Sequence, residues 1–219
     1  MVTKEDMKAS LLASFASAER NADPYPWFIL RDCVPAEAVE PLRDLPFPAP
    51  DLEGVSGTRE AHNKSRNYFD VKARGEHPVC EALAQALQDP EVVDAVAETF
   101  GTNLFNTSLR IEYGQDTDGF WLEPHTDIGV KNFTMLLYLS DGPGHDKLGT
   151  SIYSDRDTHV GETPFAPNTA MVFVPSDKTW HGFEARPIDG VRKSIIINYV
   201  TQDWRAREQL AFPEQPVGV

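Results

Sequence analysis

The sequence contains only two cysteines, Cys33 and Cys80, among its 219 residues. Two cysteines this far apart form neither a disulfide framework nor a CxxC motif. A chain of this length also buries enough surface to close a core without a cross-link or a structural metal. We therefore expect two reduced thiols in a cytoplasmic protein.

Basic residues are also scarce, because 20 lysines and arginines face 34 acidic residues and give a formal net charge of −14. Proteins that bind nucleic acids gather lysine and arginine to displace counterions from the phosphate backbone. We therefore expect no nucleic-acid partner.

Long apolar runs are missing as well. The longest, such as residues 170–175 and 195–197, fall far short of the roughly 20 residues that span a bilayer. Residues 1–20 have acids and lysines threaded through their apolar positions, unlike the apolar centre of a targeting signal. We expect no membrane segment and no targeting signal.

The first 103 residues predict helices around a single strand. Apolar spacing near 3.6 and prolines in first turns are typical of helices, which we predict at residues 4–19, 35–45, 78–87 and 90–100. A short buried strand is predicted at 27–31. The stretch 46–64, rich in proline, glycine and polar residues, predicts a mobile loop that closes over a site.

From residue 104 onward, short β-rich runs alternate with Gly, Pro, Asp and Asn. Strands are predicted at residues 104–113, 120–123, 133–139, 151–153, 169–174 and 192–200. This spacing favours an antiparallel sandwich or barrel. The chain is thus expected to be α+β, with a helical region at 1–103 in the same domain as a catalytic β core at 104–219.

The β half carries the chemistry. In the sequence Pro124-His125-Thr126-Asp127, His125 and Asp127 point to the same side of an extended chain. His181, which follows the apolar run 169–174, offers a third ligand. Two histidines and one carboxylate leave metal positions open, which suits non-haem Fe(II). An HxD triplet alone is weak evidence, since either histidine could instead be an ordinary polar residue at a strand end.

The last predicted strand adds a site for an anion. Alternation places Arg192 and Ser194 on one face, where a guanidinium and a hydroxyl can receive a carboxylate. An ion pair at a sheet end is the alternative for Arg192. Its position eleven residues after His181 favours the carboxylate site. Asn198, on the same face, is a candidate for hydrogen bonding behind the site.

The order of these motifs resembles that of the Fe(II)/2-oxoglutarate-dependent dioxygenases, and most closely their prolyl-hydroxylase-like branch. The resemblance covers residues 25–202 and includes the runs 110–114, 133–140 and 167–173. It implies a double-stranded β-helix (jelly-roll) core with N-terminal helices packed on one sheet. It also implies that Fe(II) is bound by His125, Asp127 and His181, and 2-oxoglutarate by Arg192 with Ser194.

The family chemistry implied is oxidation of 2-oxoglutarate by dioxygen to succinate and CO2, coupled to hydroxylation of a substrate. Tyr113 and Tyr138 sit where relatives contact 2-oxoglutarate, although a tyrosine packed in the core is equally consistent with either position. The chain departs from the family at Leu148-Gly149, where relatives usually carry Gly-Gly.

Other readings stay open at this point. A cupin-like metal protein without oxygenase activity, such as an isomerase or a small-molecule binder, would not need Arg192 and Ser194. A metal-free β-sandwich interaction module would make the site residues incidental. The substrate is expected to be a small molecule or a peptide. The acids Asp116 and Asp118 are expected in loops, and the remaining histidines are expected at the surface, namely His62, His77, His145 and His159.

Overall fold

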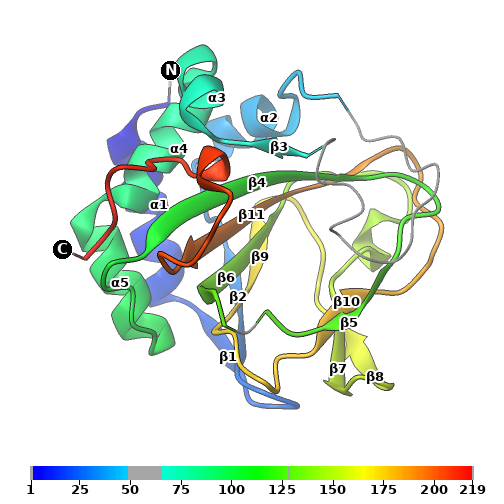
Figure 1. Ribbon diagram of the computed structural model, residues 1–219. Helices are drawn as coiled ribbons and strands as arrows, with labels where there is room; N and C mark the ends of the chain where they lie inside the picture. The colour runs from blue at the N-terminus through cyan, green and yellow to red at the C-terminus, as the bar shows by residue number, and fades with distance from the viewer. Residues whose placement is uncertain (1, 49–65, 128, 219) are drawn as a thin grey trace.

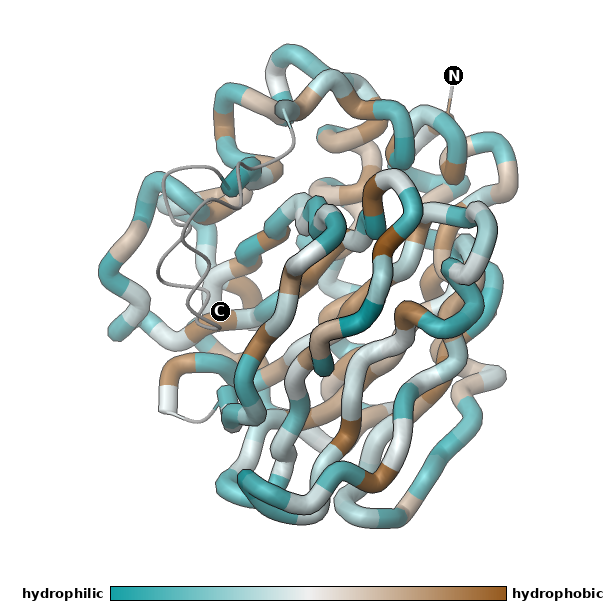
Figure 2. Tube along the Cα trace, turned by 90° about the vertical axis from the view of Figure 1, so that its right-hand side faces the viewer, coloured by the Kyte–Doolittle hydropathy of each residue, from teal (hydrophilic) through white to brown (hydrophobic). Residues whose placement is uncertain are grey.

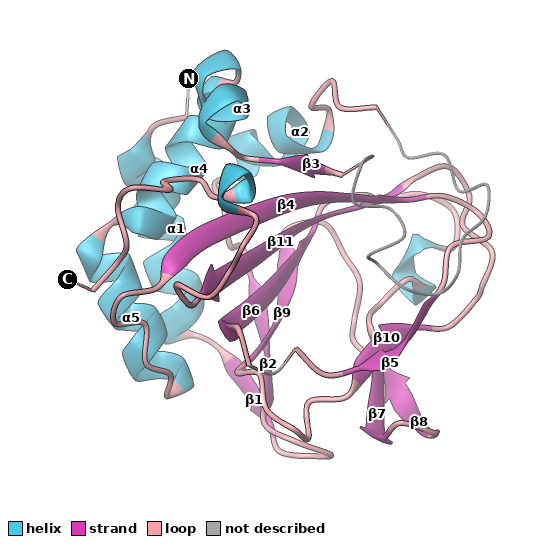
Figure 3. Ribbon diagram, viewed as in Figure 1, coloured by secondary structure: helices cyan, strands magenta, loops and turns pink. Residues whose placement is uncertain are grey.

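Helices and two antiparallel sheets form three layers (Figures 1 and 3). The computed structural model describes residues 2–48, 66–127 and 129–218. The helices are α1 (Lys4–Ala16), α2 (Ala36–Arg43), α3 (Val71–Glu76), α4 (Pro78–Gln88) and α5 (Pro90–Phe100), with 3-10 turns η2 (His145–Lys147) and η3 (Arg207–Gln209).

The larger sheet has seven strands among the described residues, in the order β1-β2-β9-β6-β11-β4-β3. Its strands are β1 (Glu19–Asn21), β2 (Trp27–Arg31), β3 (Asn67–Tyr68), β4 (Ser108–Asp116), β6 (Lys131–Tyr138), β9 (Thr169–Phe173) and β11 (Arg192–Val200). The smaller sheet has the order β5-β10-β7-β8. Its strands are β5 (Leu122–His125), β7 (Ser151–Asp155), β8 (Thr158–Glu162) and β10 (His181–Phe183).

Capping residues explain where the helices start and stop. Thr3 and Asp6 form a capping box at the start of α1, which satisfies two backbone donors at once. Asp89 caps α5, proline occupies its first turn, and Gly101 ends it at φ 70°. Glycine adopts this left-handed conformation without a Cβ penalty.

The larger sheet separates two hydrophobic cores. One face, here called the helix face, packs Ile111, Met135 and Ile197 against apolar side chains of α1, α4 and α5. The other, here called the inner face, packs Leu136, Phe173 and Ile196 against the smaller sheet. In Figure 2 hydrophobic stretches run along the strands, while most outer loops are hydrophilic. The buried apolar side chains of β6 and β11 are thus divided between the two cores, with Met135, Ile195 and Ile197 on the helix face and Leu136 and Ile196 on the inner face.

The N-terminal region differs from its prediction in two respects. Its described residues supply three strands instead of one, because residues 19–21 pair with β2 and residues 67–68 pair with β4. They also include helix α3, which was not predicted. Helix α1 ends at Ala16, three residues before the predicted end, because residue 19 belongs to β1 instead of the helix.

The expected closing loop at 46–64 lies outside the described residues from position 49 onward. Within the described part of the chain, none of the helices combines the length and the apolar character that a bilayer crossing requires. Cys33 and Cys80 are buried free thiols.

Candidate functional site

His125 and His181 face each other across two paired strands. Strand β10 runs antiparallel to β5 with His181 directly opposite His125, and the ring centroids are 4.3 Å apart. Directly opposed residues project to the same side of a sheet. The pairing is close because position 182 is glycine: a Cβ there would lie 2.7 Å from the Leu122 carbonyl oxygen.

Backbone carbonyls fix the orientation of both imidazoles. The Nδ1 of His125 lies 2.9 Å from the Glu123 carbonyl oxygen, and that of His181 lies 2.9 Å from the Thr179 carbonyl oxygen. A carbonyl oxygen only accepts, so each Nδ1 donates and each Nε2 carries the lone pair that a metal ion needs.

The carboxylate of Asp127 completes the group. Its Oδ1 lies 3.8 Å from His125 Nε2 and its Oδ2 lies 3.8 Å from His181 Nε2. Ligand atoms of the three residues all lie within 4.8 Å of one another. Two neutral imidazoles and one carboxylate form a donor set that suits a divalent transition metal. The predicted His125, Asp127 and His181 are thus brought together and could hold one.

A hydrogen-bond chain positions Asp127 from behind. Lys131 Nζ donates to Oδ1 at 2.8 Å, and Thr134 Oγ1 donates to Oδ2 at 3.2 Å. Asn198 Nδ2 in turn donates to Thr134 Oγ1 at 3.0 Å, so the amide expected behind the site lies there. No sequence motif points to Lys131, which stands four residues after the HxD motif.

The charges at this centre favour the metal-binding protonation states. Burial opposes ionisation of Asp127, but Lys131 and the two histidines outweigh it and hold the pKa of Asp127 below its usual range. Burial, followed by the nearby His125, lowers the pKa of His181 to about 3. At neutral pH the centre therefore presents a carboxylate and a neutral His181 imidazole.

Arg192 lies farther along the inner face and is almost fully buried. Its Nη1 donates to Asp116 Oδ2 at 2.6 Å and its Nε to the Leu148 carbonyl oxygen at 2.8 Å. Its Nη2 has no acceptor among the described residues. Asp116 was expected in a loop, but it ends β4 and is buried opposite Arg192 in the register. The ion-pair alternative for Arg192 is therefore present, and one edge of the guanidinium is left for a ligand.

Ser194 supplies a buried polar atom that lacks a partner. Its Oγ is shielded from solvent and makes no hydrogen bond within the described part of the chain. Gly114 lies opposite it in the register, and a Cβ at that position would come within 2.9 Å of the hydroxyl. Buried hydroxyls are normally satisfied. A hydroxyl and a guanidinium on one strand face form a donor pair that suits a carboxylate.

The two predicted tyrosines lie on opposite faces of the larger sheet. Tyr138 is on the inner face, and its hydroxyl lies 2.8 Å from the hydroxyls of both Thr150 and Thr163. Tyr113 is on the helix face and donates to the Arg43 carbonyl oxygen at 2.6 Å. Tyr113 pairs with Ile195, which also points to the helices, so its side chain lies on the face opposite the candidate metal ligands.

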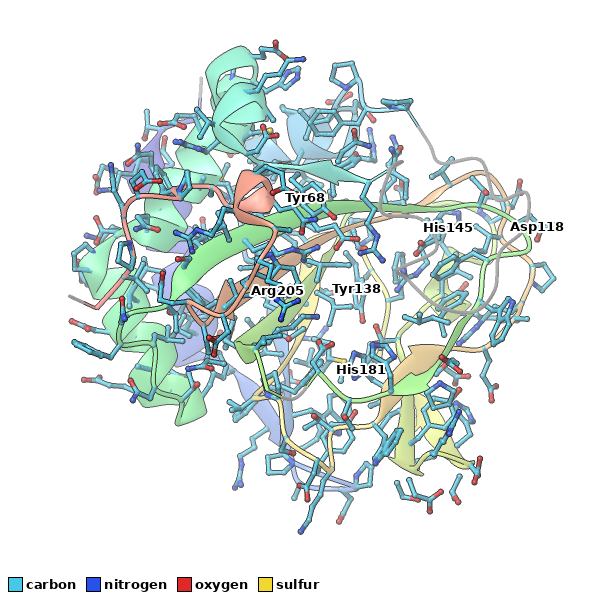
Figure 4. The ribbon with its side chains drawn as sticks, viewed as in Figure 1. Tyr68, Asp118, Tyr138, His145, His181 and Arg205 are labelled. Carbon is cyan, nitrogen blue, oxygen red and sulfur yellow. The ribbon has the colours of Figure 1, made fainter. Side chains whose placement is uncertain are left out.

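A cavity of about 490 Å³ opens between the sheets and contains the three candidate metal ligands. Arg192 and Ile196, which flank Ser194 on the inner face, both line it, as does Thr150. Figure 4 shows Tyr138 and His181 in this central region, with Tyr68 and Arg205 toward one end and His145 and Asp118 at the other. The volume falls within the usual range of small-molecule sites, about 300–1,000 Å³.

A second polar group, which motif reasoning missed, lines the same cavity. It comprises Arg66, Arg110, Glu112, Trp204 and Gln209. Arg110 Nη2 donates to Glu112 Oε2 at 2.8 Å, and Arg110 Nη1 donates to Asn198 Oδ1 at 3.1 Å. These residues come from distant segments, so no local spacing could have predicted the group.

The remaining histidines do not all lie at the surface. His159 is exposed and His77 is half-buried, while His62 lies outside the described residues. His145 is buried, against expectation, because its ring nitrogens bond to Ser140 Oγ at 3.2 Å and the Asp189 carbonyl oxygen at 2.7 Å. It joins two loops at the Arg192 end of the cavity.

No protein-family model and no curated protein matches the sequence. Solved structures are nevertheless similar over most of the chain. A prolyl 4-hydroxylase from Phytophthora capsici has a TM-score of 0.60 at 15% identity, covering 94% of this chain and 68% of that chain. A Trichoplax adhaerens prolyl hydroxylase, in complex with a hypoxia inducible factor peptide fragment, has a TM-score of 0.56 at 12% identity, covering 93% of each.

HygX from Streptomyces hygroscopicus, with nickel and 2-oxoglutarate bound, has a TM-score of 0.52 at 14% identity. The similarity covers 81% of this chain and 83% of that chain. At these identities the likeness concerns the fold. The resemblance to the prolyl-hydroxylase-like branch, drawn from the order of the motifs, is confirmed at that level: this chain has the fold of the solved prolyl hydroxylases.

Proposed function

We propose that this protein is an Fe(II)- and 2-oxoglutarate-dependent dioxygenase that hydroxylates a small molecule or a peptide side chain. The observation that carries the proposal is the group of His125, Asp127 and His181, with both Nδ1 atoms committed to carbonyl oxygens. The two-sheet arrangement is then a double-stranded β-helix. Likeness to solved prolyl hydroxylases and to HygX, which carries nickel and 2-oxoglutarate, supports this.

In this proposal His125, Asp127 and His181 hold the iron. Bound Fe(II) would activate dioxygen, the oxidant, so that oxidation of 2-oxoglutarate to succinate and CO2 is coupled to hydroxylation of the substrate. The protein contributes position and environment. Lys131 and Thr134 hold the Asp127 carboxylate, while apolar side chains from both sheets limit water in the cavity.

Arg192 and Ser194 receive the distal carboxylate of 2-oxoglutarate. Arg192 Nη2 and Ser194 Oγ, neither of which has a hydrogen-bond partner among the described residues, are both donors, which suits a carboxylate. Asp116 holds the other edge of the guanidinium and fixes its plane. Its negative charge also opposes the incoming anion, so Asp116 is expected to moderate the affinity.

Paired variants test the binding role of Arg192 and the repulsion between Asp116 and the incoming carboxylate. Arg192→Met alone would leave Asp116 buried without its partner, so the informative variant is Arg192→Met combined with Asp116→Asn, and Asp116→Asn alone is the control. Charge-assisted bonds contribute about 1.5–3 kcal/mol each. We expect the double variant to bind 2-oxoglutarate about tenfold to several hundredfold more weakly, and Asp116→Asn to bind it as well as or better than the parent.

Isothermal titration under anaerobic conditions, with Mn(II) in place of iron, measures both affinities. Mn(II) binding should be unchanged in both variants because the three ligands are intact. Equal 2-oxoglutarate affinity in all three proteins would contradict the role of Arg192. A parent that binds Mn(II) without 2-oxoglutarate would instead favour a cupin-like metal protein. Iron-dependent succinate release with a substrate library then tests turnover.

A further inference from the structure

The end of the cavity near β3 and the C-terminal segment carries more positive than negative charge. Arg66 and Arg110 both contact the same carboxylate: Arg66 Nε lies 3.4 Å from Glu112 Oε1, and Arg110 Nη2 lies 2.8 Å from Oε2. All three residues line the cavity. This local surplus stands in a chain whose formal net charge is −14.

The two arginines differ in what they leave available. Arg110 is almost fully buried, and its donors are engaged by Glu112, Asn198, Gln209 and Tyr68. Arg66 is more open, with 14% of its side chain exposed. Its Nη1 and Nη2 have no acceptor among the residues that the structure describes. Arg110 therefore has a structural role in the cavity lining, whereas Arg66 can donate two hydrogen bonds to a ligand at this end of the cavity.

Trp204 adds a third donor to the same end. It lines the cavity, and the Arg110 guanidinium lies 4.9 Å from the centre of its ring. Its indole Nε1 is shielded from solvent and has no hydrogen-bond partner within the described ranges. A buried indole N–H normally finds an acceptor. Two independent observations thus indicate a ligand that accepts hydrogen bonds here. One is the arginine whose Nη atoms have no acceptor among the described residues, and the other is the indole N–H without a partner there.

Hydrogen bonds connect this end to the metal centre. Arg110 bonds to Asn198, Asn198 to Thr134, and Thr134 to Asp127. Three hydrogen bonds therefore separate Arg110 from the Asp127 carboxylate. A molecule bound at the Arg66 end of the cavity can therefore direct a carbon several bonds away toward the metal. Arg192, at the other end, would bind 2-oxoglutarate.

From this arrangement we infer that the substrate is a small organic acid whose carboxylate binds between Arg66 and Trp204. This inference rests on the proposed function. A carboxylate satisfies the Arg66 fork and the indole N–H and balances the surplus charge. A neutral peptide offers only carbonyl oxygens, which satisfy hydrogen bonds but leave the charge unbalanced.

The test compares acids with their own amides. The probes are the N-acetyl-L-amino acids and the matching N-acetyl-L-amino acid amides, together with phenylacetate and phenylacetamide. N-Acetyl-L-prolinamide represents a prolyl peptide. Binding to the protein loaded with Mn(II) and 2-oxoglutarate is measured anaerobically by thermal shift and isothermal titration. We expect at least one acid to bind tenfold or more tightly than its amide.

Variants then assign the preference to these residues. Arg66→Met should reduce the acid preference to less than threefold. Trp204→Phe keeps a ring beside Arg110 but removes the N–H. It should weaken the binding of acids several-fold more than the binding of amides. Arg31→Met is the matched control, because Arg31 also makes one ion pair with a glutamate but lies at the surface. Arg31→Met should leave the preference for acids over amides unchanged.

The outcomes separate the two proposals. Amides that bind as tightly as acids, or an acid preference unaffected by Arg66→Met, would overturn the inference while the oxygenase assignment stands. Loss of 2-oxoglutarate affinity in Arg66→Met would also overturn it, because this end would then hold the co-substrate. A parent protein that does not bind 2-oxoglutarate would defeat both proposals.

Discussion

Gly182 offers the sharpest test of how the metal centre is built. The residue follows His181 on β10, and a Cβ at this position would lie 2.7 Å from the Leu122 carbonyl oxygen and 3.2 Å from that of Glu123. Both contacts are to the backbone of β5, so no side-chain rotation can relieve them. Gly182→Ala therefore has to move β10 away from β5.

The size of that movement follows from ordinary packing. Contacts at a Cβ usually start at about 3.4 Å, so β10 must shift by about 0.7 Å relative to Leu122. Metal sites tolerate deviations of about 0.2 Å in ligand distance. Since His125 lies on β5 and His181 on β10, the shift separates two ligands by more than a metal ion accepts. We expect Gly182→Ala to bind Mn(II) at least tenfold more weakly.

The same overpacking should cost stability in the metal-free protein, about 1–3 kcal/mol. Urea unfolding followed by circular dichroism measures the stability, and Mn(II) titration followed by electron paramagnetic resonance measures the metal affinity. Gly75→Ala is the matched control, because nothing lies within 4 Å of a Cβ there. Because Gly75 is an exposed residue of α3, Gly75→Ala should raise the free energy of unfolding by about 0.5–1 kcal/mol. Parental Mn(II) affinity in Gly182→Ala would refute the argument that this strand pairing sets the site.

Three further changes test the surroundings of the centre. Gly114→Ala should displace the Ser194 hydroxyl. Titrations should then show several-fold weaker binding of 2-oxoglutarate and unchanged binding of Mn(II). Thr134→Val removes a donor to Asp127 and should weaken Mn(II) by about 10–100-fold, the range for residues that orient metal ligands. The pKa of His181, lowered to about 3 from 6.5, means that the unfolded chain binds the proton more readily. The metal-free protein should therefore lose stability as the pH falls from about 6.5 toward 3, by up to about 1.4 kcal/mol per pH unit. Urea unfolding of His181→Gln should show a shallower loss over that window, and an identical slope in both proteins would contradict the buried neutral state.

Much of the secondary structure could be predicted from local signals. The bounds of α5, β2 and β11 match the predicted ranges. Each has a strong local cause: proline and glycine at the ends of α5, and runs of β-branched and aromatic residues in the two strands. Alternation along β11 also predicted which side chains share the inner face with Arg192.

The parts that could not be predicted depend on pairing between distant segments. Strand β10 has three residues and an irregular register with β5, so it shows no periodicity. It nevertheless brings His181 to His125. The face on which Tyr113 lies could not be chosen either, because sequence alone does not give the register of β4 against β11, and a shift of one residue reverses every side chain.

The two proposed ligands agree with the distribution of buried polar groups on the larger sheet. On β4 and β11 the helix face is apolar except at Gln115 and Lys193, whereas the inner face buries several charged and polar side chains. Burying such groups is costly unless each finds a partner. Most of them do, through the ion pairs at Asp116 and Glu112 and through the chain that ends at Asp127. Of the buried side-chain atoms without a partner in the described ranges, Trp204 Nε1 belongs to a residue that lines the cavity, and Ser194 Oγ lies between two lining residues. Both are donors, they lie near opposite ends of the cavity, and the metal ligands lie between them. A fold selected for stability alone would fill these positions with apolar side chains, as it does on the helix face. The two proposed ligands, 2-oxoglutarate near Ser194 and an organic acid near Trp204, would account for both donors.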